Sequence, residues 1–118
     1  MANLLEETIR VLNNYGKKPD DVLWVGRDYI DWDSKRSSYK CTWESFSKKA
    51  NFYYYDNGYG GIEVPLDLII VGADFWLERH EYDGREWWEF KAMPIEPDEI
   101  HELDLSSFGI GDSYNYGR

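Results

Sequence analysis

The sequence predicts a single α+β domain: an N-terminal helix and a second short helix packed on a mostly antiparallel sheet that contains a C-terminal β-hairpin. Three observations predict it. A helical apolar stripe covers residues 4–15, a second amphipathic stretch lies near the middle, and two alternating segments flank Asp83-Gly84. The chain of 118 residues is long enough for one domain with a modest core. We expect residues 1–105 to form the domain and residues 106–118 a flexible tail.

Both predicted helices carry start signals. Asn3, followed by Glu6 three residues later, is similar to a capping box, while Gly16 and then Pro19 end the first helix. Thr42 is a typical N-cap for the second helix. The apolar residues expected on one side of that second helix are Trp43, Phe46 and Ala50.

Short apolar runs predict the strands. Residues 22–25 form a β-branched run that we expect to end at Gly26. Residues 29–39 are polar and predict turns or a hairpin. Residues 68–71 are continuously apolar, which predicts a central strand buried on both faces.

The clearest structural signal is the segment from Phe75 to Ala92, because Asp83-Gly84 is typical of a two-residue hairpin turn. In that register Glu78 opposes Glu89. The predicted core face carries Phe75, Leu77, Trp88, Phe90 and Ala92, interrupted near the turn by Arg79, Glu81 and Glu86. The other face carries Trp76, Glu78, His80, Tyr82, Arg85, Trp87, Glu89 and Lys91.

The polar face of this hairpin permits three interpretations. Glu78, His80 and Glu89 can converge on a divalent metal, or they can form a general acid/base set in which one carboxyl raises the pKa of the other. The third interpretation is a solvated face whose like-charge repulsion is relieved by Arg85 or Lys91. The sequence has no HExxH and no CxxC motif. We therefore predict neither a metal nor a cofactor.

The charge is unevenly distributed. The net charge is −10, and residues 1–59 balance nine acidic against nine basic side chains, whereas residues 60–118 hold fourteen acidic and four basic ones. Such a field repels nucleic acid and anionic membranes and attracts basic surfaces. It argues against direct nucleic-acid binding, and the alternative role of the charge is solubility.

The segment YYYDNGYGGIE combines tyrosines, which give large and stiff contact areas, with glycines that let the backbone bend. It lacks the Lys-Ser/Thr of a phosphate-binding P-loop. We expect Tyr53, Tyr55 and Tyr59 to be partly exposed and, with Trp76 and Trp87, to anchor a protein partner. The alternative is that the tyrosines pack in the core around an ordinary turn.

The single cysteine and the first fifteen residues together predict the cellular compartment of the protein. Cys41 is the single cysteine, so it forms no internal disulfide, as expected in a reducing cytoplasm. The first fifteen residues carry acidic side chains and no secretion signal, and no apolar run reaches the roughly 20 residues of a membrane span. We expect a cytoplasmic protein of a bacterial cell.

The series WVG, TWESF, GYGG, DLIIVG and FWLERHEYDG resembles a set of short proteins encoded by gut Firmicutes prophages and other mobile elements. The resemblance covers about residues 4–94, and its hairpin part is the most specific. That set has no established activity, so it supplies no catalytic residue. It implies a setting in which small acidic proteins inhibit host defence, as anti-CRISPR proteins do.

These observations lead to one main functional hypothesis and two alternatives. The main hypothesis is a non-enzymatic inhibitor that docks an acidic, aromatic face on the basic nucleic-acid-binding groove of a host protein, such as a CRISPR effector or another nuclease. The alternatives are a small metal-dependent or acid/base enzyme and a homodimeric structural or assembly protein; the chain itself is expected to be a monomer or a homodimer. In the main hypothesis the side chains that stand in for phosphates are Glu78, Glu81, Glu86 and Glu89.

Overall fold

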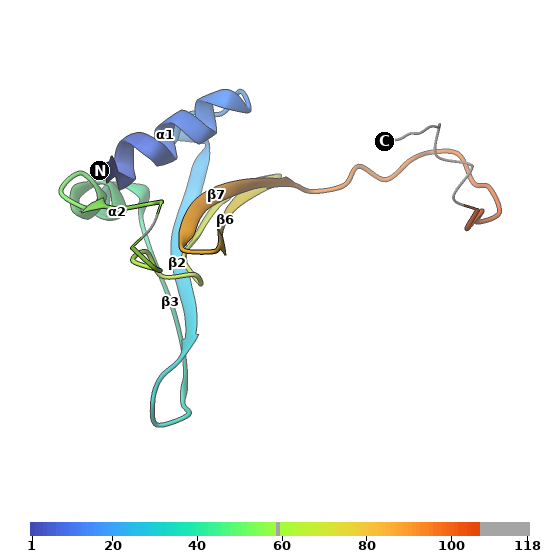
Figure 1. The fold of residues 1–118 in the computed structure, drawn as a ribbon. Helices are drawn as coiled ribbons and strands as arrows, with labels where there is room; N and C mark the ends of the chain where they lie inside the picture. Colours follow the sequence, from blue (N-terminus) through green and yellow to red (C-terminus); the bar gives the residue numbers. More distant parts are fainter. Residues whose placement is uncertain (59, 107–118) are drawn as a thin grey trace.

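The computed structural model describes residues 1–58 and 60–106 and shows an α+β fold (Figure 1). The described residues form helices α1 (Leu4–Asn14) and α2 (Trp43–Ala50) and a 3-10 turn at Pro19–Asp21. The main strands are β2 (Val22–Ile30), β3 (Arg36–Cys41), β5 (Ile69–Gly72), β6 (Phe75–Tyr82) and β7 (Arg85–Ala92). They form one antiparallel sheet in the order β3-β2-β5-β6-β7, and β1 (Ala2–Asn3) pairs separately with β4 (Tyr54–Tyr55).

The first helix begins and ends as its sequence predicts. The side chain of Asn3 accepts a 2.9 Å hydrogen bond from the backbone N–H of Glu6. At the other end, the N–H of Lys17 donates to the carbonyl of Leu12, and Gly16 has a φ of 75°. This is a Schellman ending, which needs a residue in the left-handed region and so favours glycine.

The second helix is also confirmed, with Thr42 as its N-cap, because the Thr42 hydroxyl accepts a 3.0 Å bond from the N–H of Ser45. Its buried side chains, Phe46 and Ala50, join the core. Helix α2 packs on β2 and α1 packs on β7. Both helices therefore cover the same face of the sheet. Within residues 1–58 and 60–106, no helix has the length and apolarity needed to cross a membrane.

The prediction that the strand from Val22 ends at Gly26 is wrong, because β2 continues to Ile30 and pairs with β3 along that length. Glycine serves a packing role here instead. A Cβ at position 26 would lie 2.7 Å from the Trp24 ring and 2.8 Å from the backbone oxygen of Tyr39. The strand thus needs glycine where another side chain and a neighbouring backbone approach closely.

Beyond Gly26, β2 leaves the sheet with only β3 as its partner, because its pairing with β5 ends at Gly26 and Ile69. Residues 27–39 therefore form a two-stranded ribbon, here called the hairpin arm, which projects from the domain in Figure 1. The predicted hairpin between residues 29 and 39 is confirmed, and it is longer than expected.

Strand β5 occupies the centre of the sheet, as predicted. Its burial is one-sided, however: Ile70 and Gly72 are buried, whereas Ile69 and Val71 are half-buried. The prediction of burial on both faces is wrong, because both helices lie on the same side of this sheet and leave the other face open.

The hairpin of β6 and β7 has the predicted register, with Tyr82 opposite Arg85 and Glu78 opposite Glu89. Asp83 and Gly84 have φ angles of 53° and 84°. Positive φ at both turn residues is the signature of a type I′ turn, whose twist matches that of the flanking strands. The turn therefore fixes which side chains of this hairpin face the helices and which face outward.

Candidate functional site on the open face of the sheet

The sheet face opposite the helices, here called the open face, carries three half-buried tryptophans from three strands. Paired residues of neighbouring strands share a face, and the register places Trp24 beside Val71 and Val71 beside Trp76. Trp87 lies further along the same face, opposite His80. The open face comprises Trp24, Lys40, Ile69, Val71, Trp76, Glu78, His80, Trp87, Glu89 and Lys91.

Two of these tryptophans hold the two glutamates of the hairpin. Nε1 of Trp76 donates a 2.7 Å hydrogen bond to Oε1 of Glu78, and Nε1 of Trp87 donates a 3.2 Å bond to Oε2 of Glu89. Each pair is two residues apart on one strand, so both side chains face the same way. The segments WLERH and WWEFK thus place the same Trp-x-Glu unit on each strand, and antiparallel pairing sets the two carboxylates side by side.

A histidine and a lysine relieve the repulsion between the two carboxylates. Nε2 of His80 lies 2.6 Å from Oε2 of Glu78 and 3.6 Å from Oε1 of Glu89. Lys91 Nζ lies 3.5 Å from Oε1 of Glu89. These distances bring Glu78, His80 and Glu89 together on the face that the predicted register gave them, and Lys91 accompanies them as a neighbouring cation.

The acid/base alternative required one carboxyl to raise the pKa of the other, and the contacts act in the opposite direction. The Trp76 indole and then His80 hold the pKa of Glu78 below its ordinary value. The Trp87 indole, with His80 and Lys91, does the same for the pKa of Glu89. Both groups are therefore ionised at neutral pH, which suits them to accept hydrogen bonds from a cation and not to act as general acids.

Metal binding by this cluster finds no support in its geometry. Among the residues that the structure describes, no group of three or more His, Cys, Asp and Glu side chains is arranged to hold a metal ion. The oxygens of Glu78 already face the Trp76 indole and His80. The enzyme alternative stays a prediction that metal titration would test.

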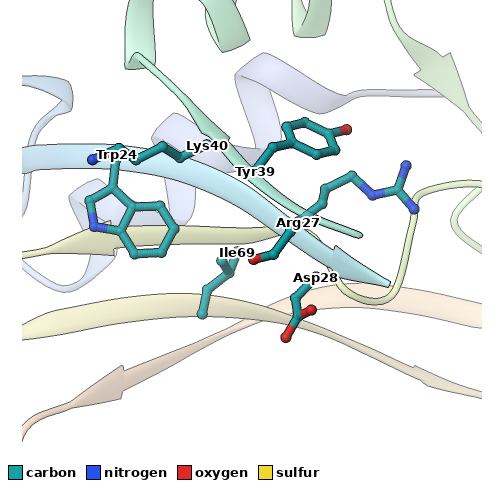
Figure 2. Close-up of a pocket in the computed structure, with 7 residues that line it drawn as sticks. Trp24, Arg27, Asp28, Tyr39, Lys40 and Ile69 are labelled. Atoms are coloured by element: carbon teal, nitrogen blue, oxygen red, sulfur yellow. The ribbon is translucent and has the colours of Figure 1, made fainter. Parts of the chain in front are cut away.

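A shallow hollow of about 480 Å³ lies at the β2 end of the open face. Figure 2 shows side chains that line it. Trp24, Ile69 and Asp28 lie on one side of β2, while the side chains of Arg27 and Tyr39 leave on the other. Sequence reasoning did not single out Trp24 or Lys40 as site residues. The alternation of Trp24, Gly26 and Asp28 along the strand is the signal that would have placed Trp24 on an outward face.

Tyr55 lies in the interior, so the expectation that it is partly exposed is wrong. Its side chain is fully buried, whereas Tyr54 is exposed, because β4 pairs with β1 and the Tyr55 hydroxyl reaches Glu7 of α1 and Arg79 of β6. The Tyr55 hydroxyl donates to Oε1 of Glu7, and burial raises the pKa of Tyr55. Tyr55 therefore fixes β4 to α1.

Glu86 is also buried, so its carboxylate is not accessible to another protein. Its carboxylate accepts hydrogen bonds from the backbone N–H groups of Glu63 (2.7 Å) and Val64 (3.0 Å) and from Arg79 (3.0 Å). The expectation that Glu86 stands in for a phosphate is corrected for this reason. Its role in the fold is to tie the loop before β5 to the hairpin.

The other predicted contact residues lie in separate places. Tyr53 is exposed, and its hydroxyl donates to the backbone oxygen of Glu63. Glu81 is exposed at the turn end of β6, on the face opposite Glu78 and Glu89. Tyr59 lies outside the described residues. The structure thus brings Trp76, Trp87 and the two open-face glutamates together and leaves Tyr53 and Glu81 away from them.

Comparison of this chain with protein-family models, with curated proteins and with solved structures finds no match.

Proposed function

We propose that this chain is a non-enzymatic binding protein that docks the open face of its sheet on a basic surface of another protein. The observation that carries the proposal is the pairing of Trp76 with Glu78 and of Trp87 with Glu89 on a sheet face that the described helices leave uncovered. Exposed aromatic residues rimmed by charge are typical of protein interfaces.

The chemistry of the open face favours arginine and lysine side chains. Two ionised carboxylates side by side accept hydrogen bonds from a guanidinium, and the neighbouring indole rings offer faces for cation–π contact. Glu78 and Glu89 are each held by an indole N–H, so less side-chain entropy is lost when a partner binds. Tryptophan is among the residues that contribute most to binding energy in interfaces.

The overall charge supports the same class of partner. A net charge of −10 steers the chain towards basic proteins and away from nucleic acid. Basic grooves are characteristic of proteins that bind nucleic acid, so Glu78 and Glu89 would take the positions of phosphates. The resemblance to mobile-element proteins makes a CRISPR effector or another bacterial nuclease the first partner to test.

The test is capture of purified CRISPR effectors and nucleases on immobilised chain, washed at low and at high salt. We expect the wild type to retain a partner at low salt and to release it at high salt, because screening weakens exposed charge pairs. The variants Trp76→Ala/Trp87→Ala and Glu78→Gln/Glu89→Gln should lose that partner even at low salt, because they lack the aromatic or charged contacts. Phe52→Ala is the matched control, since Phe52 is 80% exposed outside the open face. Equal capture by the wild type and the Glu78→Gln/Glu89→Gln variant would overturn the proposal.

A further inference from the structure

The tip of the hairpin arm presents a tryptophan to solvent. Trp32 is 96% exposed, and its neighbour Ile30 is 72% exposed. Tryptophan is among the residue types that contribute most to binding energy when an interface forms. The hairpin arm therefore offers a contact residue that is separate from the open face.

The backbone that carries Trp32 is held in place by local hydrogen bonds. Oδ1 of Asp31 accepts from the N–H groups of Asp33 and Lys35, both at 3.0 Å, and the N–H of Asp31 donates to the carbonyl of Lys35. Further along the ribbon, Arg36 forms a two-pronged ion pair with Asp28 across the strands. A fixed backbone lowers the entropic cost of docking this tryptophan.

A complementary hollow lies at the base of the same arm, on the face covered by α2. Its volume is about 210 Å³, and its lining is mostly apolar. A cavity of about 150 Å³ admits a benzene ring, so this hollow is of a size for a larger aromatic side chain. Residues that line it include Val25, Cys41, Phe46 and Leu68, with Arg27 and Lys49 as cations.

We propose that two copies of the chain pair their hairpin arms antiparallel, so that Trp32 of each copy enters the hollow beside α2 of the other. The tip and the hollow lie at opposite ends of one arm. When two identical arms run antiparallel, seating one tip in one hollow brings the second tip to the second hollow. Such a contact is self-complementary and closes as a two-fold dimer.

Charge and packing favour a second copy as the occupant. Asp31 and Asp33 flank Trp32 at the tip, with Lys35 beyond them, and the hollow carries Lys49 and Arg27, of which Arg27 is paired with Asp67. The proposed dimer brings Asp33 to Lys49 twice. The face of the arm that continues from the hollow carries Tyr29 and Tyr39 in edge-to-face contact, with Tyr39 52% exposed. An antiparallel partner arm would cover these rings.

This interface uses the hairpin arm and the helix-covered face, whereas the proposed partner site lies on the open face. Failure of either proposal therefore leaves the other standing, because Trp32→Ala tests only the arm and Trp76→Ala/Trp87→Ala tests only the open face.

The first experiment measures molecular mass by light scattering and sedimentation across a range of concentrations. We expect the wild type to approach twice the 14.0 kDa of one chain as concentration rises. Trp32→Ala should weaken the dimer about thirtyfold or more, as for a hot-spot residue, while Phe52→Ala leaves it unchanged. A wild-type chain that keeps the mass of one copy at about 1 mM would overturn the proposal.

The second experiment locates the interface with the single cysteine, because Cys41 is partly exposed and lines the hollow. The thiol should react with a disulfide reagent more slowly at concentrations where the dimer forms, and Trp32→Ala should remove this protection. Asp33→Lys and Lys49→Glu should each weaken the dimer, and combining them should restore it. A dimer that leaves Cys41 fully reactive uses another surface and would overturn the proposal.

Discussion

Nη2 of Arg79 donates a 3.0 Å hydrogen bond to Oε1 of Glu86, and neither side chain is exposed to solvent. The same nitrogen lies 3.1 Å from the Tyr55 hydroxyl, and Nη1 lies 3.4 Å from Oε1 of Glu7. One guanidinium therefore joins β6, β7, β4 and α1 inside the core. Buried charges of this kind are tolerated only while they remain paired and hydrogen-bonded.

Replacement of Arg79 by methionine should strongly destabilise the fold. The change leaves the carboxylates of Glu7 and Glu86 buried without their cation, and breaking a buried pair typically costs about 3–5 kcal/mol of unfolding free energy. Urea unfolding, monitored by circular dichroism, measures the loss of unfolding free energy relative to the wild type. Arg85→Met, a change to the exposed arginine of the same hairpin, should stay within about 0.5 kcal/mol. Equal stability of the two variants would show that the buried network contributes little.

A second stability prediction concerns Thr8, which is fully buried on α1. Its hydroxyl donates to the carbonyl of Leu4 at 2.6 Å and accepts from Nε1 of Trp88 at 2.8 Å. Thr8→Val keeps the shape but leaves the buried indole N–H without an acceptor, which should cost about 1–3 kcal/mol. Thr8→Ser retains the hydroxyl, so it should preserve the bond and lose mainly methyl packing. Thermal unfolding of the wild type and the two variants measures these losses. A smaller loss of stability for Thr8→Val than for Thr8→Ser would show that the bond from Trp88 to Thr8 is not important.

The parts of the fold that the sequence predicted correctly are encoded locally. Asp83-Gly84 allows few turn geometries, so it determines the register of β6 and β7 and every facing pair of the hairpin. The N-caps Asn3 and Thr42 each accept a hydrogen bond from the backbone N–H three residues later, so they depend only on the local sequence. The facing of Glu78 with Glu89, and the place of His80 on the same face, follow from that register.

The errors occurred where distant segments decide the outcome. Tyr55 is buried because β4 pairs with β1, more than fifty residues away, and no local alternation reveals that pairing. Glu86 is buried because backbone N–H groups of Glu63 and Val64 and the side chain of Arg79 satisfy it together. The omission of Trp24 has a local cause instead, because Gly26 is also typical of a strand end, although here it is the glycine on which the indole packs.

Gly26→Ala should test that packing. The added Cβ would approach the Trp24 ring to 2.7 Å and the Tyr39 backbone oxygen to 2.8 Å, so either the ring or the strand must shift. We expect a loss of about 1–3 kcal/mol, as for overpacking, with a change in the environment of the Trp24 ring. Gly58→Ala is the matched control, because its Cβ would meet Asp56 at an ordinary 3.6 Å. Indole chemical shifts measured by NMR would contradict the geometry if Gly26→Ala left them unchanged.

The open-face carboxylates predict a pH dependence whose sign follows from their lowered pKa values. The pKa of Glu78 is lowered first by the Trp76 indole and then by His80, and that of Glu89 is lowered first by the Trp87 indole. A carboxyl whose folded pKa lies below its unfolded value stabilises the fold at pH above the unfolded pKa, about 4.3 for glutamate. That stability is lost as pH falls through the folded pKa.

We therefore expect the wild type to be more stable than Glu78→Gln/Glu89→Gln at neutral pH, and the difference to shrink as pH falls below about 4. Urea unfolding of both proteins at a series of pH values measures this difference directly. Asp28, whose pKa is lowered by Arg36, is common to both proteins, so its contribution cancels. If repulsion between Glu78 and Glu89 outweighed their indole, histidine and lysine contacts, the variant would be the more stable protein at neutral pH. The sign of the difference thus decides whether these carboxylates are stabilised by their neighbours before any partner binds.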